Sequence, residues 1–120
     1  MEKAAVFAMD DALERVDHDV ELLQELIQIF LQEHLKGEVV MKRALEAGDA
    51  TTLAHAAHAL KGAAANVGAM EAARLAGLIE VNAGQQTFSD VLQLLPLLSE
   101  AVVEFRRAEE SQLTAARSVK

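Results

Sequence analysis

Apolar residues recur along most of this chain at intervals of three and four positions, the spacing of one face of an α-helix. The pattern is clearest over residues 20–34. A first apolar stripe on this segment consists of Val20, Leu23, Ile27, Phe30 and Leu31. A second stripe, beside the first, consists of Leu22, Leu26 and Ile29. Two stripes on one helix predict burial on two sides, as happens inside a helical bundle.

Capping residues divide the apolar pattern into helices. Asp17 or Asp19 would cap the segment that starts at residue 20, and Gly37 is a candidate bend within it. Gly48 then ends that helix and Asp49 caps the next. The expected helices cover residues 4–16, 20–34 with a continuation over 38–46, 50–67, 69–82 up to Gly84, and, from a cap at Thr87 or Ser89, a last helix to about residue 110.

The last helix contains the only proline of the chain. Pro96 would remove one backbone hydrogen bond and crowd the carbonyl of Leu92, so we expect a kink there. Residues 111–120 are expected to form a frayed tail after a single domain over residues 1–110. Four substantial helices with short connections predict an all-α fold, an antiparallel four-helix bundle.

Composition supports this fold and predicts a core of small residues. Hydrophobic residues make up 52% of the chain but aromatic residues only 3%, so aliphatic side chains and alanine must fill most of the core. The large pieces of the core would be Phe7, Phe30, Phe88 and Phe105. The core side of the third helix would consist of Leu53, Ala57, Leu60, Ala64 and Val67.

Charge and cysteine content exclude several classes of function. The net charge of −8 argues against binding to nucleic acid or to an anionic membrane surface, because both require clustered Lys and Arg. Without cysteine the chain has no disulfide, zinc–thiolate site or cysteine nucleophile. The first residues do not form a secretory signal, and no uncharged apolar run approaches the ~20 residues that span a bilayer. We expect a cytoplasmic protein.

The residues most suggestive of chemistry lie on the third helix. With the core stripe at zero, His58 falls at about 140° on the helix and points away from the core, with Gly62 one turn later on the same strip. A large side chain at position 62 would lean over the imidazole, because helical side chains lean toward the N-terminus. A glycine inside a helix costs about 1 kcal/mol of stability relative to alanine, so its presence at position 62 needs a reason. Because Gly62 faces away from the predicted core, clearance above His58 is favoured over close helix packing.

Lys61 is the second candidate beside His58. Its ammonium could meet an oxyanion attached to the imidazole, although a surface lysine without a role would have the same spacing. An exposed imidazole is largely neutral at pH 7, and histidine forms covalent intermediates as a nucleophile. Other chemistries lack their signatures: His55 and His58 do not have the spacing of zinc proteases, no histidine follows a glutamate by three positions, and no phosphate-binding glycine loop is present.

The run AHALKGAAANVGA over residues 57–69 resembles the signature of histidine-containing phosphotransfer (Hpt) domains. The resemblance extends from about Phe7 to Arg106 and includes the segments 45–49 and 75–80. It implies an up-down four-helix bundle that is preceded by a short helix covering one end.

The resemblance also implies roles for individual residues. His58 would take a phosphoryl group from an aspartyl phosphate on a receiver domain, through the nitrogen remote from the backbone, and pass it to an aspartate of another receiver. Lys61 would help to neutralise the phosphate, and Gly62 would keep the site open. Glu80 would accept a hydrogen bond from the other ring nitrogen and fix the tautomer, unless it is an ordinary solvated glutamate.

The implied protein is a phosphocarrier of two-component signalling, not an enzyme, and it needs no cofactor. Its partners would be response-regulator receiver domains and a hybrid sensor histidine kinase, with Mg²⁺ held by the receiver. We expect a monomer with a flat surface of small residues near the imidazole, including Ala54, Ala65 and parts of the second helix. Ala63 and Ala64 depart from the family, which often has serine there.

Three alternatives remain open. The chain could be an Hpt-like bundle that docks a partner without transferring phosphate, or a metal-binding helical bundle. It could also be the dimerisation and phosphoacceptor domain of a histidine kinase. An intact His58 with Lys61 and Gly62 favours transfer over docking alone.

Overall fold

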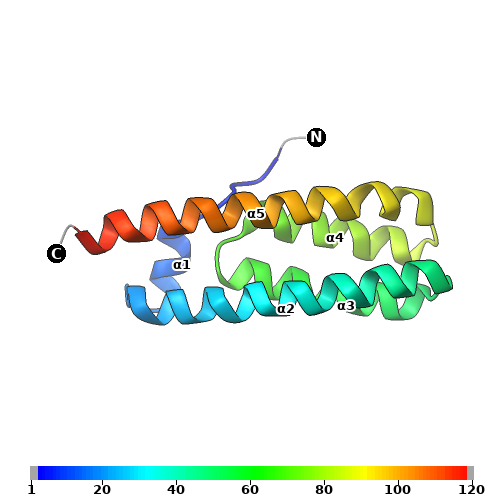
Figure 1. Cartoon of the computed structure of the whole chain (residues 1–120), viewed down its shortest axis with the longest axis horizontal. Coiled ribbons are helices and arrows are strands. Elements are labelled where there is room, and N and C mark those ends of the chain that lie inside the picture. Colours follow the sequence, from blue (N-terminus) through cyan, green and yellow to red (C-terminus); the bar gives the residue numbers. More distant parts are fainter. Residues whose placement is uncertain (1–2, 119–120) are drawn as a thin grey trace.

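The computed structural model describes residues 3–118, and within that range the chain folds into helices joined by short turns (Figure 1). Helices α2 to α5 pack in chain order and α5 returns beside α2, while the short α1 lies across one end of the bundle. The predicted fold class, an up-down four-helix bundle with a short N-terminal covering helix, is confirmed. The helices are α1 (Met9–Arg15), α2 (Val20–Ala47), α3 (Ala50–Asn66), α4 (Met70–Gly84) and α5 (Phe88–Ser118).

Two of the predicted caps define where α2 and α3 begin. The Asp19 carboxylate accepts a hydrogen bond of 3.1 Å from the backbone N–H of Leu22, and Asp49 accepts one of 3.1 Å from Thr52. Between these helices Gly48 adopts φ +68°, in the left-handed region that favours glycine at the end of a helix. These local interactions set the starting point of α3, the helix that carries the candidate site.

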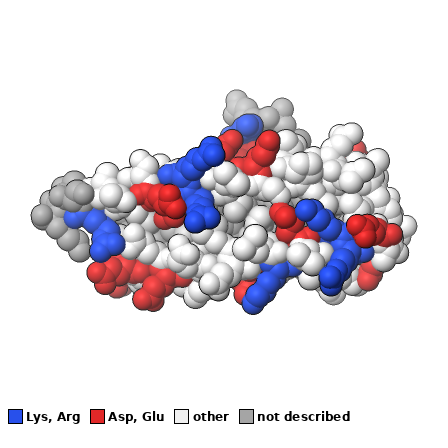
Figure 2. All heavy atoms as spheres, in the orientation of Figure 1, with Lys and Arg blue, Asp and Glu red and all other residues white. Residues whose placement is uncertain are grey.

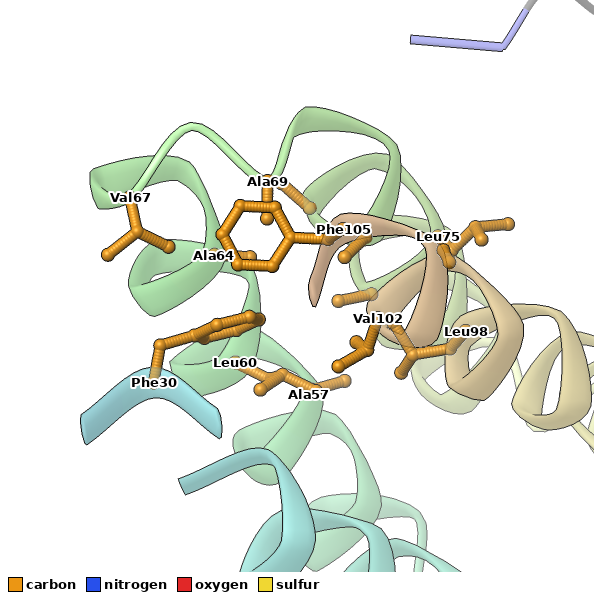
Figure 3. Close-up of a cluster of buried hydrophobic side chains, with 14 of the residues drawn as sticks. Phe30, Ala57, Leu60, Ala64, Val67, Ala69, Leu75, Leu98, Val102 and Phe105 are labelled. Carbon is orange, nitrogen blue, oxygen red and sulfur yellow. The ribbon is translucent and has the colours of Figure 1, made fainter. Parts of the chain in front are cut away.

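Three phenylalanines join different parts of the chain in the core, and two of them, Phe30 and Phe105, are labelled in Figure 3. The Phe105 ring of α5 meets Phe7 and Phe30 edge-on, with ring centroids 5.3 and 5.6 Å apart. Phe88 is only partly buried, so the prediction of four phenylalanines in the core is right for three of them. The predicted core side of α3 is confirmed, because its members are all buried: Leu53, Ala57, Leu60, Ala64 and Val67.

The first helix begins later than the sequence predicts. Residues 4–8 are not helical, because their backbone groups bond to the connection between α3 and α4. The Ala8 N–H donates to the Gly68 carbonyl at 2.8 Å, and the Glu71 N–H donates to the Ala5 carbonyl at 2.9 Å. Gly68 has φ +80°, and a Cβ there would lie 2.8 Å from the Ala8 carbonyl oxygen, so only glycine fits at this corner.

The last helix ends later than predicted. α5 contains Pro96 and continues to Ser118, so the expected frayed tail is wrong for residues 111–118; residues 119–120 lie outside the described part. Leu113 is fully buried, and the Arg117 guanidinium donates to the Gln24 side chain of α2 at 3.2 Å. The end of α5 is therefore held against α1 and the start of α2 (Figure 1).

The surface differs from the expectation on α2. Leu22 is 41% and Ile29 is 55% exposed, so the second apolar stripe is not buried as predicted. Charged side chains of both signs lie beside one another on the face drawn in Figure 2 rather than in a single basic patch. Within residues 3–118 no helix has the length and apolar character needed to cross a membrane.

Candidate functional site

Helices α3 and α4 bring three of the residues singled out from the sequence into one cluster. The His58 Nδ1 of α3 lies 2.9 Å from Oε2 of Glu80 on α4. The other oxygen of the same carboxylate, Oε1, lies 2.9 Å from the Lys61 Nζ. The imidazole is the outermost member of the cluster, since 67% of the His58 side chain is exposed against 42% for Lys61 and 29% for Glu80.

The Glu80 carboxylate determines which ring nitrogen carries the proton. The hydrogen bond from Lys61, and then the charge of His58, lower the pKa of the Glu80 carboxyl below its usual value. The carboxylate is therefore ionised at neutral pH and can only accept hydrogen bonds, so Nδ1 must donate. In a neutral ring this leaves Nε2 unprotonated, with the lone pair that a nucleophile needs.

Gly62 lies on the exposed side of α3, one turn beyond His58. A Cβ at this position would meet no atom within 4 Å. Close packing of a neighbouring helix therefore does not explain the glycine. A longer side chain at position 62 would extend into the open space on the same strip of the helix as the imidazole. That Gly62 keeps this space clear for a group approaching His58 stays a prediction.

The other histidines do not join this cluster. His55 is exposed on α3, and His34 is buried between α2 and α5. Within residues 3–118 no three His, Asp or Glu side chains are grouped closely enough to hold a metal ion. The geometry thus offers one exposed nucleophile that is flanked by an ammonium and a carboxylate.

The model of the Hpt domain family matches residues 25–112, which take in most of α2, all of α3 and α4, and most of α5. The chain belongs to the Hpt family. Hpt domains carry out phosphotransfer in two-component systems, as phosphocarriers rather than as catalytic enzymes, and they interact with receiver domains and histidine kinases. Comparisons with curated proteins and with solved structures give no match.

This Hpt domain also has an apolar groove beside α3 that the sequence did not reveal. The exposed Ile29 of α2 and the small Ala63 of α3 contribute to it, and so does Arg15, whose guanidinium donates to the Ala65 carbonyl. Helical periodicity identified the stripe on α2, but not whether another helix covers it. The groove is lined by Arg15, Val16, Leu26, Ile29, Phe30, Glu33, Ala63, Asn66 and Val67.

Proposed function

We propose that this Hpt domain is a phosphorelay carrier. His58 accepts a phosphoryl group from the aspartyl phosphate of one receiver domain, which a hybrid sensor histidine kinase supplies, and passes it to an aspartate of another receiver. The observation that carries this proposal is the exposed imidazole whose Nδ1 is bonded to Glu80. This bond leaves Nε2 as the available nucleophile.

The transfer step follows from that tautomer. The Nε2 lone pair attacks the phosphorus, the bond between phosphorus and the aspartyl oxygen breaks, and the receiver aspartate leaves as a carboxylate. Because the ring keeps its Nδ1 proton it becomes cationic, and the Glu80 carboxylate at 2.9 Å opposes that charge. Onward transfer reverses these steps, with the carboxylate of a second receiver as the nucleophile.

The remaining parts of the chemistry are divided between the two proteins. The Lys61 ammonium contacts the same carboxylate as His58, and its role would be to pair with oxygens of a phosphoryl group on His58. Mg²⁺ and the acidic side chains around it belong to the receiver, so this chain needs no cofactor of its own.

The groove between α2 and α3 supports a docking site for the receiver. In-line transfer requires the acidic site of the receiver to come directly over the imidazole. Apolar side chains that stay exposed near a candidate site are typical of protein interaction surfaces, and Ile29, which lines the groove together with Ala63 of α3, is of this kind. Ala54 and Ala65 are both only partly buried on α3, and their short side chains do not project above the surface around His58.

The substitution His58→Gln tests the proposal directly. We expect the variant to take no phosphoryl group from prephosphorylated receivers, because glutamine has no nucleophilic nitrogen, while its far-UV circular dichroism is unchanged. The matched control is His55→Gln, an exposed histidine one turn earlier on α3, which should label like the wild type. Full labelling of the His58→Gln protein would refute the assignment. Receivers that bind the wild-type domain without ever labelling it would indicate a docking module instead.

A further inference from the structure

Gly77 differs from the other glycines that lie inside helices. A Cβ added at Gly77 would lie 3.2 Å from the Cδ of Lys61, whereas a Cβ at Gly37, Gly62 or Gly84 would meet nothing within 4 Å. The space that a side chain would take at Gly77 is thus already filled by the stem of Lys61. A contact of 3.2 Å would force that stem to move by a few tenths of an ångström.

The position of Gly77 on α4 explains why this contact matters. Residues three apart on a helix are neighbours on its surface, so Gly77 and Glu80 lie one above the other. The stem of Lys61 crosses α4 over the glycine and ends with its ammonium 2.9 Å from Glu80 Oε1. The path across Gly77 therefore leads to the same carboxylate that holds His58.

Helix propensity does not account for glycine at this position. Glycine is the poorest helix former after proline, and α4 uses alanine at several neighbouring positions. These alanines are Ala72, Ala73, Ala76 and Ala83. Glycine at position 77 weakens the helix but leaves room for the stem of Lys61, and this room explains the choice of glycine.

We propose that Gly77 is a positioning residue, which gives Lys61 a direct path over α4 to Glu80 and so places the ammonium beside the phosphoacceptor imidazole. The effect of Gly77 on phosphotransfer rests on the proposed function. Its effect on the placement of Lys61 does not, because that placement is a property of the unphosphorylated protein.

The first test needs no partner protein. In Gly77→Val the new Cβ would lie 3.2 Å from the Lys61 Cδ and carries two methyl groups, so the lysine stem is displaced and the ammonium is pushed away from Glu80. We expect the pKa of the Glu80 carboxyl, followed by ¹³C NMR, to rise, because the Lys61 hydrogen bond is the largest cause of its lowering. The control Gly37→Val makes the same exchange in α2, where nothing lies within 4 Å, and should leave the titration unchanged. Gly77→Ala should give a smaller rise, and it serves if valine disturbs the fold.

A double substitution shows whether Gly77 acts through Lys61. Lys61→Met removes the ammonium and should raise the pKa of Glu80 by itself. Adding Gly77→Val to that variant should raise it no further. An unchanged Glu80 titration in folded Gly77→Val, or an additional shift in the double variant, would overturn the proposal.

The second test measures transfer. The initial rate of labelling by a phosphorylated receiver should fall about tenfold in Gly77→Val, as expected for loss of one hydrogen bond to a charged group, with no further fall when Lys61→Met is already present. A rate equal to that of Gly37→Val would show that Gly77 has no part in transfer. If no receiver labels the wild type, the proposed function fails, and the titration of Glu80 still decides the relation between Gly77 and Lys61.

Discussion

At the scale of single residues, the candidate site depends as much on missing side chains as on those present. Gly62 on α3 leaves open space beyond the imidazole, and Gly77 on α4 leaves space that Lys61 fills. Both glycines lie inside helices, where their low helix propensity destabilises the fold. Substitution at Gly62, where an added side chain meets no neighbour, should therefore separate stability from function.

Gly62→Gln provides this separation at the exposed position. We expect the variant to be more stable by up to about 1 kcal/mol, because glutamine is a better helix former, yet to accept a phosphoryl group about tenfold more slowly, because its side chain reaches over the imidazole. Urea unfolding and the initial labelling rate measure the two effects. Gly37→Gln is the control, with a similar gain in stability and an unchanged rate. A normal rate in Gly62→Gln would remove the clearance argument.

At the scale of the helices, the two ends of the chain are held by contacts between distant segments. Residues 4–8 bond to the corner between α3 and α4, and the last turns of α5 pack at the end of the bundle near α1. Leu113 is fully buried in that part of α5. The C-terminal turns thus belong to the folded domain.

Truncation of the Leu113 side chain tests this assignment. Leu113→Ala should lower the free energy of unfolding by about 2–5 kcal/mol, the usual cost of removing a buried leucine side chain. Gln112→Ala, at the exposed neighbouring position, should change it by less than about 0.5 kcal/mol. Urea unfolding of both variants measures the difference. Equal, negligible effects would mean that the tail is frayed in solution.

Sequence reasoning predicted the features that depend on local chemistry. The starts of α2 and α3 were predictable because the cap and the capped N–H lie three residues apart. His58 and Gly62 were found because they share one strip of a single helix, and Lys61 because it lies one turn beyond His58 on that helix. The structure of residues 4–8 was not predictable, since their partners Gly68 and Glu71 are far away in sequence.

The rest of the site depends on how two helices pack. Periodicity alone gives no sign that Glu80 faces His58, and only the resemblance to Hpt domains suggested it. The place of Gly77 beneath Lys61, and the groove beside α3, follow from the alignment of neighbouring helices. A pattern along one helix carries no information about that alignment.

At the scale of the whole molecule, the seam between α2 and α5 contains a buried titratable group. His34 is 5% exposed, and its Nε2 has no hydrogen-bond partner and lies 3.7 Å from Glu38. Glu38 also accepts hydrogen bonds from Lys42 and from Ser99 of α5, and Arg106 of α5 lines the same groove. Burial lowers the pKa of His34 below 6.5, and the nearby Glu38 only partly offsets this effect.

The lowered pKa of His34 makes the bundle less stable in mild acid. Near pH 6 the unfolded chain binds a proton at His34 more readily than the folded chain does. This difference has no effect on the free energy of unfolding above pH 6.5, and it lowers that free energy as the pH drops below 6.5. We expect His34→Leu to reduce the difference in unfolding free energy between pH 7.5 and pH 5.5, measured in urea. Carboxylates with a lowered pKa, such as Glu38 and Glu80, lose their contribution to the free energy of unfolding only below about pH 4.5. That loss lies outside the range from pH 5.5 to pH 7.5.

His55→Gln is the control for this experiment, because that side chain is exposed on α3. It should leave the difference between the two pH values as it is in the wild type. A His34→Leu protein with the full wild-type difference would show that another group is responsible.

The exposure of the His58 imidazole also affects how long a phosphoryl group could remain attached to it. Enzymes that protect a reactive intermediate close over it and exclude water. Two-thirds of the His58 side chain is open to solvent, so a phosphoryl group carried there would stand in bulk water between encounters. Its lifetime would be that of a phosphorus–nitrogen bond in the surrounding medium, shorter in acid, and the duration of the signal would be governed by the supply of receivers rather than by the fold.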